Sequence, residues 1–270
     1  MLYDTFVRRA CQGLDLDWRK YRRKQSRKAV EGRMRELGLA GFDQYLDKIR
    51  DDPGEASALP DRMRVTVSRF FREKDCWREL TDQVLPELAD KVSSSYLRAL
   101  CLGINNGEEP YSLALLWKQS MEPLYPDVGL RIFGVDMDAG CLARAKERTY
   151  HGRTLREVPE EIQSRWFTQS KGMYVLDREP AAMVEFSQAH LMDPGLPGQL
   201  DLLLCRYLVF TYFTGVRRKK AVERLARLVK PGGKLMIGRK ETLRPDEFVW
   251  FAPLSSARFI AQRTSKSVPP

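Results

Sequence analysis

From about residue 96 onwards the sequence alternates between short apolar segments and longer amphipathic ones. The apolar segments have the length and composition of buried strands, whereas the amphipathic segments repeat their apolar residues at helical spacing. Strands joined through helices run parallel in one sheet, and the helices cover its faces, so an α/β fold is expected. The expected strands are YLRALCLG (96–103), LRIFGVD (130–136), LDLLLCR (200–206) and KPGGKLMIG (230–238), and the expected helices are PYSLALLWKQS (110–120), AGCLARAKERTY (139–150) and VRRKKAVERLARLV (216–229).

The first 90 residues differ, because their apolar residues recur at helical spacing and turn residues divide them into short helices. We expect a small, basic, helical domain over residues 1–90 and the α/β domain over residues 91–262. The segment 173–187 is expected to form a short antiparallel hairpin inserted in the second domain. The polar residues 263–270 are expected to be a disordered tail.

The composition excludes several other classes of protein. The 270 residues are 43% hydrophobic, which is enough for a globular core. The five cysteines form no CxxC pair and only two histidines occur, so neither a disulfide framework nor a metal site is expected. The N-terminal segment lacks the apolar core of a signal peptide, and no apolar run approaches the roughly 18 residues of a membrane span. A cytoplasmic protein without membrane insertion is expected.

Basic residues are concentrated near the N-terminus. The formal net charge is +10, and nine Lys or Arg stand against two Asp between Arg8 and Lys28. Such a run is either a solvated helix face or a docking surface for an acidic partner. Because no nucleic-acid-binding signature accompanies it, an acidic protein is favoured over nucleic acid as the partner.

The stretch CLGINNGEEPYS (101–112) ends the first expected strand and begins the first expected helix of the α/β domain. In doubly wound sheets ligands bind at this end of a strand. Gly103 and Gly107 allow the backbone to approach a ligand closely. Glu108 and Glu109 suit the helix dipole but would repel a pyrophosphate, so a neutral or cationic ligand such as S-adenosylmethionine is expected rather than NAD or ATP. The alternative is that both glutamates only stabilise the helix.

A second acidic position supports a nucleoside ligand. Asp136 ends the next expected strand, where a carboxylate can accept hydrogen bonds from both ribose hydroxyls. Together with LDLLLCR and the Pro-Gly-Gly turn before the last expected strand, these features are typical of a class I, Rossmann-like methyltransferase core.

Five motifs occur in order along the chain: RFFRE (69–73), GEEPYS (107–112), GVDMD (134–138), LLCR (203–206) and PGGKLMIG (231–238). Through them the sequence resembles the CheR-type protein-glutamate methyltransferases of bacterial chemotaxis, over about residues 12 to 245. The resemblance implies a class I fold with a small antiparallel subdomain, S-adenosylmethionine as methyl donor and S-adenosylhomocysteine as product. It also implies that the acceptors are glutamate side chains on chemoreceptor helices, so the acidic partner would be such a helix.

The resemblance also implies roles for single residues. Arg72 and Tyr212 would lie at the methyl-transfer centre, and Asp136 would bind the ribose. A glutamate carboxylate is ionised near pH 7, since its reference pKa is about 4.3, so proximity and orientation matter more than a strong general base. The guanidinium of Arg72 can hold the carboxylate and aim one oxygen at the methyl group. The residues expected to contact the cofactor are Thr66, Ser68, Arg72, Gly103, Glu109, Asp136, His190, Leu191, Tyr207 and Leu208.

Some positions depart from the family pattern. His190 and Tyr207 stand where the family has asparagine, and a tyrosine cannot offer the paired donor and acceptor of a carboxamide. Three functions are therefore considered. They are a protein-glutamate methyltransferase, a methyltransferase of the same fold that acts on RNA, another protein side chain or a small molecule, and a catalytically inactive S-adenosylmethionine-binding regulatory module.

Overall fold

The computed structural model describes residues 1–64, 68–92, 95–254 and 258–268. The chain divides into two compact units. The small unit contains Met1–Thr66 and Leu208–Lys220, and the large unit contains Val67–Tyr207 and Ala221–Pro270. The boundary between Lys220 and Ala221 lies inside the helix α12 (Gly215–Leu228).

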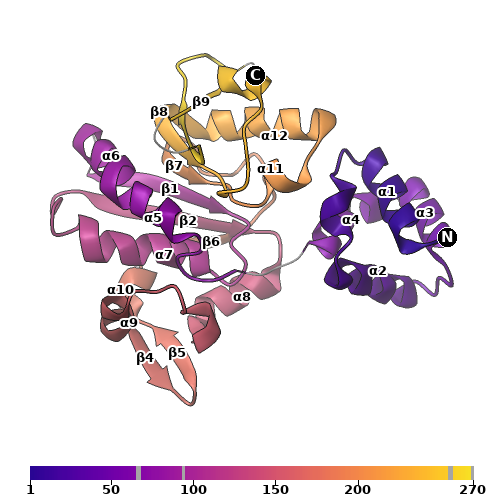
Figure 1. Cartoon of the computed structure of the whole chain (residues 1–270), viewed down its shortest axis with the longest axis horizontal. Coiled ribbons are helices and arrows are strands. Elements are labelled where there is room, and N and C mark those ends of the chain that lie inside the picture. Colours follow the sequence, from indigo (N-terminus) through magenta and orange to yellow (C-terminus); the bar gives the residue numbers. More distant parts are fainter. Residues whose placement is uncertain (65–67, 93–94, 255–257, 269–270) are drawn as a thin grey trace. The chain divides into compact units, whose positions relative to one another are not determined.

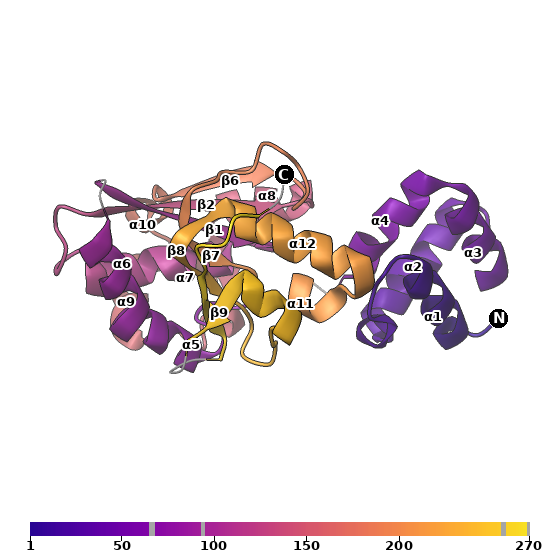
Figure 2. The same cartoon turned by 90° about the horizontal axis from the view of Figure 1, so that it is seen from above.

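The small unit is built from short amphipathic helices that pack around an aromatic core, as Figure 2 shows for α1 to α4. Phe6 of α1 stacks on Tyr45 of α3, with ring centroids 5.6 Å apart. Asp52 caps α4 by accepting a hydrogen bond from the Gly54 N–H at 2.9 Å, and Pro53 occupies the first turn, where an N–H would lack an intrahelical partner. The first elements are α1 (Tyr3–Gly13), η1 (Trp18–Tyr21), α2 (Lys24–Glu36), α3 (Phe42–Asp51) and α4 (Pro53–Met63).

A later segment of the chain, residues 208–220, returns to the small unit. It contains α11 (Val209–Tyr212) and the first turns of α12. Gly215 begins α12 with a φ of +49° and lies against the Asp15 carboxylate, which leaves no room for a side chain. Asp15 caps the helix by accepting a hydrogen bond from the Val216 N–H at 3.1 Å.

The large unit is built on a sheet that has seven strands in the described part of the chain, in the order β6-β2-β1-β7-β8-β10-β9. The first five of these run parallel, and β10 is antiparallel to both of its neighbours. All residues of β7 are buried, as expected of a central parallel strand. The strands are β1 (Tyr96–Leu102), β2 (Gly129–Asp136), β6 (Val184–Gln188), β7 (Leu200–Leu204), β8 (Val229–Met236), β9 (Phe251–Pro253) and β10 (Ile260–Arg263).

Helical segments connect β1 to β2, β2 to β6 and β7 to β8 (Figure 1), whereas the described residues between β6 and β7 form no helix. Asp138 caps α8 by accepting a hydrogen bond from the Gly140 N–H at 2.8 Å, which fixes the start of this helix directly after β2. The helical elements after β1, apart from α11 and α12, are α7 (Glu108–Leu116), η3 (Trp117–Met121), α8 (Ala139–Glu147), η4 (Gly152–Thr154), α9 (Glu160–Trp166), α10 (Arg178–Ala181) and η5 (Pro245–Val249).

The strand order reverses between β1 and β7. From β1 the chain continues through α7 to β2 on one side, and from β7 it continues through α12 to β8 on the other. Ligands of doubly wound sheets bind beyond the carboxyl ends of the strands at this point of reversal. Residues 103–107 and 205–207, which follow β1 and β7, therefore flank the expected ligand position. The predicted α/β fold with helices in the N-terminal part is confirmed.

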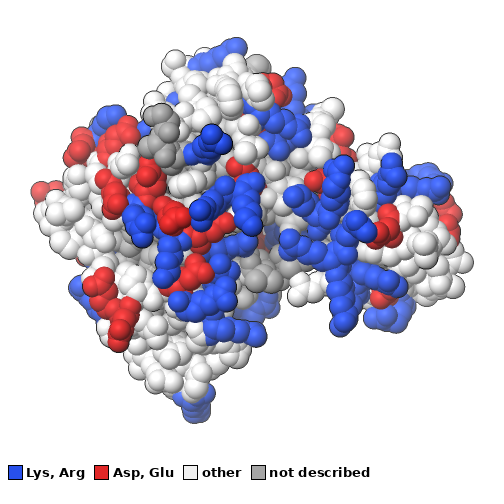
Figure 3. Space-filling model, viewed as in Figure 1, with Lys and Arg blue, Asp and Glu red and all other residues white. Residues whose placement is uncertain are grey.

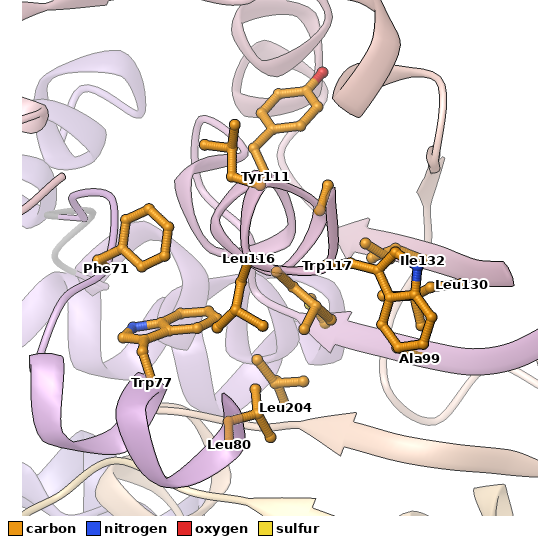
Figure 4. Close-up of a cluster of buried hydrophobic side chains, with 14 of the residues drawn as sticks. Phe71, Trp77, Leu80, Ala99, Tyr111, Leu116, Trp117, Leu130, Ile132 and Leu204 are labelled. Carbon is orange, nitrogen blue, oxygen red and sulfur yellow. The ribbon is translucent and has the colours of Figure 1, made fainter. Parts of the chain in front are cut away.

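The helices of residues 74–91 belong to the large unit, whereas the sequence analysis placed them in the N-terminal domain. Their apolar side chains enter the core of the sheet. Trp77 and Leu80 point toward Leu116 of α7 and Leu204 of β7 (Figure 4). Helical spacing predicts a helix but does not show which core its apolar face joins. These elements are α5 (Lys74–Glu79), η2 (Leu80–Val84) and α6 (Leu85–Lys91).

The antiparallel insertion differs from the hairpin expected at residues 173–187. β5 (Met173–Leu176) pairs with β4 (Phe167–Ser170) and with β3 (Thr149–His151) in a separate antiparallel sheet, which Figure 1 shows beside α9. The residues of β6 instead pair with β2 in the main sheet, in parallel. Because α10 separates β5 from β6, the two strands enter different sheets instead of pairing across a tight turn.

The C-terminal segment enters the main sheet, although residues from 263 onwards were expected to be a disordered tail. Ile260–Arg263 forms β10 and pairs with β8. The buried guanidinium of Arg263 donates to the Ala226 carbonyl at 2.8 Å and to the Lys266 carbonyl at 2.7 Å. These bonds hold the chain as far as Lys266, and a strand this short has too few residues for its periodicity to be recognised.

Candidate functional site

The loop between β1 and α7 has a backbone that few residues adopt readily. Gly103 and Gly107 have φ values of +72° and +86°, and Asn105 has +53°, all in the left-handed region that glycine and asparagine tolerate best. A Cβ atom at Gly107 would lie 3.0 Å from the Cβ atom of Ala145 in α8. The two glycines are therefore required by the path that the loop takes along the carboxyl edge of the sheet.

Asp136 ends β2 beside this loop and is almost completely buried. Its Oδ2 atom accepts a hydrogen bond from the Asn105 N–H at 3.0 Å, and its Oδ1 atom accepts one from the Asp138 N–H at 3.1 Å. The Gly103 N–H donates to the Val135 carbonyl at 2.8 Å. The structure thus brings together the glycine loop and the carboxylate that were expected to contact the cofactor.

His190 follows β6 and is linked to the same edge of the sheet. The residue before it donates its N–H to the Asp136 carbonyl at 3.2 Å. The His190 N–H donates to the Asp193 carboxylate at 2.7 Å, and its Nδ1 atom accepts from the Met192 N–H at 3.1 Å. Because Nδ1 is an acceptor, a neutral His190 carries its ring proton on Nε2.

Arg206, Glu73 and Glu109 form a buried ionic cluster where β7 ends. The Arg206 side chain is only 3% exposed, and its Nη2 and Nη1 atoms lie 2.8 Å and 3.1 Å from carboxylate oxygens of Glu73 and Glu109. Its Nη2 atom also donates to the Arg72 carbonyl at 2.8 Å. The cluster therefore ties the segment of Arg72 to the strand end and to the start of α7.

Burial and charge act in opposite directions on the two carboxyl groups of this cluster. Burial raises the pKa of Glu109 above its ordinary value, and the charge of Arg206 offsets part of that rise. Burial alone would also raise the pKa of Glu73, but hydrogen bonds from Tyr207, from the Arg239 N–H and from Arg206 bring it below its ordinary value. Glu73 is therefore ionised at neutral pH, and the charge of Arg206 favours the ionised form of Glu109.

Arg72 lies over the ring of Tyr207, with its guanidinium carbon 4.3 Å from the ring centroid. The Tyr207 hydroxyl donates to the Glu73 carboxylate, and the Tyr207 N–H donates to the Glu241 carboxylate at 2.8 Å. Burial and the bond to Glu73 raise the pKa of Tyr207 to about 12, so the phenol stays protonated at neutral pH. Tyr207 thus contacts the Arg72 segment, whereas the sequence analysis assigned it to the cofactor.

The sequence matches two family models over most of its length. Residues 66–260 match the SAM-binding domain of the CheR methyltransferases, and residues 3–63 match their all-alpha domain. The chain belongs to the CheR methyltransferase family. A probable chemotaxis protein methyltransferase of Rhizobium etli is 30% identical over 216 residues, which are 77% of this chain and 80% of that protein. A chemotaxis protein methyltransferase of Listeria monocytogenes is 27% identical over 241 residues, 89% of this chain and 90% of that protein.

This CheR family member is an S-adenosylmethionine-dependent methyltransferase, which confirms the predicted family, activity and cofactor. The site fits this cofactor on its own chemistry. Carboxylates at Glu109 and Asp136 suit a ligand that carries a sulfonium, an ammonium group and ribose hydroxyls. Gly107 has no space for a side chain because Ala145 and Tyr111 lie against it, so this glycine fixes the path of the loop at the carboxyl edge of the sheet.

Tyr212, which was expected at the methyl-transfer centre, belongs to the small unit, whereas Arg72 belongs to the large unit. The buried ring of Tyr212 packs against Tyr21, with ring centroids 5.1 Å apart. Its carbonyl accepts a hydrogen bond from the Asp17 N–H at 2.9 Å. Tyr212 is thus part of the core of the small unit, and its role in methyl transfer stays a prediction.

Four other expected cofactor residues lie away from the glycine loop in the sequence. Thr66 lies outside the described residues, and Ser68 follows it in the segment that leads to Arg72. Leu191 is buried next to His190, and Leu208 lies in the small unit. Their contacts with the cofactor stay predictions.

The sequence analysis gave no role to Glu73, Arg206 or Glu241, although they connect much of the site. Each lies within or next to a motif quoted above, RFFRE, LLCR or PGGKLMIG. For Arg206 the available signal was a charge directly after an apolar run, whereas Glu73 and Glu241 stand among other charged residues. Arg206 and Glu73 are separated by 133 residues in sequence, so only the fold reveals that they are paired. Among the described residues, no helix is both long and apolar enough to cross a membrane.

Proposed function

We propose that this chain methylates glutamate side chains on an acidic helix of a chemoreceptor. The observation that supports this most directly is Arg72, whose side chain lies on the Tyr207 ring and whose backbone is bonded to the buried ionic cluster. A planar guanidinium binds a carboxylate through two parallel N–H···O bonds, which is the recognition that a glutamate acceptor requires. The two relatives described above are both named as chemotaxis methyltransferases.

The chain's own residues contribute mainly position to the reaction. S-adenosylmethionine supplies an electrophilic methyl group on a sulfonium centre. An ionised glutamate, with a reference pKa of about 4.3, needs to lose no proton near pH 7 before its oxygen attacks. Arg72 holds this carboxylate so that one oxygen faces the methyl group in line with the bond that breaks. Arg206 keeps the Arg72 backbone in place through the bond from its Nη2 atom.

On the cofactor side, Asp136 accepts hydrogen bonds from the ribose hydroxyls, and the backbone at Gly103 faces the cofactor. Glu109 faces its cationic amino acid part. Support for this role comes from the position of Glu109 at the start of α7, directly after the glycine loop, where its carboxylate is only 14% exposed and a nearby cation stabilises the ionised form. The remaining cofactor contacts are proposed for Thr66, Ser68, Arg72, His190, Leu191 and Leu208, with Tyr212 beside the acceptor.

The acidic substrate docks on the basic surface of the small unit. Lys and Arg side chains gather there over α2 and its neighbours (Figure 3). Trp18 lies among Arg8, Arg19 and Arg22, whose guanidinium carbons are 6.0, 5.6 and 5.6 Å from its ring centroid. A hollow of about 490 Å³ lies beside this tryptophan. Tryptophan and arginine are among the residues that most often dominate binding energy at protein interfaces, and the positive charge of the arginines complements an acidic helix.

The acceptor is identified by the chemistry of the methylated product. The purified chain is incubated with S-adenosylmethionine that carries a radioactive methyl group and with the cytoplasmic fragment of a chemoreceptor. Release of radioactive methanol in base shows a carboxyl methyl ester. A base-stable methyl group on protein, RNA or a small molecule would show another acceptor, and cofactor binding without any transfer would show a regulatory module.

The role of Arg72 is tested in the same assay. Arg72→Ala is expected to lower kcat/KM for the acceptor by at least tenfold, because the carboxylate loses a charged bidentate partner. Arg78→Ala is the matched control, since the Arg78 side chain is 71% exposed. Equal activity of both variants would remove Arg72 from the acceptor site.

A further inference from the structure

We propose that Tyr207 is a positioning residue for the acceptor: its ring holds the Arg72 guanidinium in the orientation that binds the glutamate carboxylate. This inference rests on the proposed function, because it concerns the group that holds the acceptor. In this inference Tyr207 contacts Arg72 instead of the cofactor that the sequence analysis assigned to it.

The backbone of Tyr207 shows that its surroundings impose its position. Its φ is +55°, a left-handed conformation that is an outlier for a bulky side chain and persists only where neighbouring groups fix it. The Tyr207 N–H donates to Oε2 of Glu241 at 2.8 Å, and the same oxygen accepts from the Gly238 N–H at 2.7 Å. One carboxylate therefore fastens the backbone on both sides of this corner, where β7 and β8 end.

The ring of Tyr207 is confined by its neighbours. The Arg72 guanidinium carbon lies 4.3 Å from the ring centroid, which is the geometry of a cation–π contact. A Cβ atom at Gly238 would lie 2.7 Å from two ring carbons of Tyr207, so the ring fills the space that a side chain at 238 would need. The ring thus fits only because residue 238 is a glycine.

The hydroxyl group of Tyr207 fastens the far end of the ring. It donates to the Glu73 carboxylate, which also accepts from Nη2 of Arg206 at 2.8 Å and from the Arg239 N–H at 3.1 Å. Glu73 is the residue next to Arg72. The ring is consequently held at its backbone and at its hydroxyl, so it can restrain the Arg72 side chain, which otherwise has many rotamers.

A cation–π contact suits this purpose because of how a guanidinium binds its partners. The aromatic ring takes one face of the guanidinium plane, whereas a carboxylate binds at the N–H groups along its edge. A contact of the Tyr207 ring with that face therefore does not compete with carboxylate binding at the edge, and it reduces the freedom lost when the acceptor binds. An asparagine at 207 has no aromatic face and would not restrain Arg72 in this way.

The test separates Arg72-mediated positioning from cofactor contact. Tyr207→Leu removes the ring face, Tyr207→Phe keeps it and removes only the hydroxyl, and circular dichroism checks that both fold. The acceptor kcat/KM is measured by base-labile methylation, and S-adenosylhomocysteine affinity is measured by calorimetry. We expect kcat/KM to fall about tenfold in Tyr207→Leu and about threefold in Tyr207→Phe, with cofactor affinity changed less than twofold in both.

A double-mutant cycle tests whether Tyr207 acts through Arg72. In the Arg72→Ala background, Tyr207→Leu is expected to change kcat/KM less than twofold, because the group it orients is already absent. A tenfold fall that persists in this background would overturn the inference. A matching tenfold loss of S-adenosylhomocysteine affinity in Tyr207→Leu would also overturn it, since Tyr207 would then contact the cofactor.

A measurement that needs no catalytic turnover tests this inference independently of the proposed function. The NMR order parameter of the Arg72 Nε–H group is measured in the wild type and in both Tyr207 variants. A clear fall in Tyr207→Leu, with a smaller fall in Tyr207→Phe, supports the positioning role even if the carboxyl methylation assay fails for the wild type. An order parameter that is the same in all three proteins would overturn it.

Discussion

Replacing Arg206 with methionine is expected to destabilise the large unit strongly. Methionine has a similar length but no charge, so Glu73 and Glu109 would lose a partner that lies 2.8 Å and 3.1 Å away. The Arg206 side chain is almost completely buried, and removing one member of a buried ion pair typically costs about 3–5 kcal/mol, because a charge stays buried without compensation. We expect the free energy of unfolding to fall by an amount in this range at pH 7.5.

The loss should depend on pH in a defined direction. Burial raises the pKa of Glu109 in the folded chain, and Arg206 offsets part of the rise. A carboxyl group whose pKa is raised by folding favours the folded state below its unfolded pKa, and this contribution is lost as the pH rises through the folded pKa. Without Arg206 the folded pKa of Glu109 rises further. The difference between variant and wild type should therefore be larger at pH 7.5 than at pH 5.

The assay is equilibrium unfolding in urea, followed by tryptophan fluorescence, since Trp77 and Trp117 lie in the core of the large unit. Arg78→Met is the control, because its pair with Asp75 at 3.8 Å is exposed and should contribute less than about 1 kcal/mol. The additional change Glu109→Gln should restore part of the stability of Arg206→Met. A loss below about 1 kcal/mol at pH 7.5, or one that is equal at pH 5, would refute this account of the cluster.

Two further predictions concern the glycine loop and the basic surface. Gly107→Ala should lower the free energy of unfolding by about 1–2 kcal/mol and weaken S-adenosylhomocysteine binding, because φ is +86° and the new Cβ atom would lie 3.0 Å from the Cβ atom of Ala145. Urea unfolding measures the first effect and calorimetry the second. An unchanged affinity would show that the loop does not contact the cofactor. Changing Arg22, Arg23 and Arg27 to glutamate should raise the acceptor KM and leave cofactor affinity intact; turnover equal to that of the wild type would show that the acidic substrate docks elsewhere.

Local patterns in the sequence were sufficient for most of the large unit. The run from 96 to 136 has an apolar strand, a glycine turn, a helical segment and a second strand, and the structure forms β1, α7 and β2 there. The hairpin at 173–187 was wrong for a physical reason. Two strand-like segments close in sequence indicate a hairpin, but pairing depends on the connection between them, and α10 directs β5 and β6 into different sheets.

The candidate site shows the same limit. Gly103, Glu109 and Asp136 lie in local motifs, and their association follows from the rule that ligands bind at the carboxyl ends of parallel strands. The pairing of Arg206 with Glu73 joins segments that are 133 residues apart, and no local pattern indicates it. The left-handed backbone of Tyr207 is equally invisible in sequence, because tyrosine is not a residue that favours positive φ.

The central claim is that Asp136 and the glycine loop bind S-adenosylmethionine. Calorimetry with S-adenosylhomocysteine tests it most directly, on the wild type, on Asp136→Ala and on Asp127→Ala, an exposed aspartate of the same unit. We predict binding by the wild type, equal binding by Asp127→Ala, and at least tenfold weaker binding by Asp136→Ala, because the ribose hydroxyls and the Asn105 N–H lose their acceptor. No binding by the wild type at millimolar ligand, or equal affinity in all three proteins, would contradict the account.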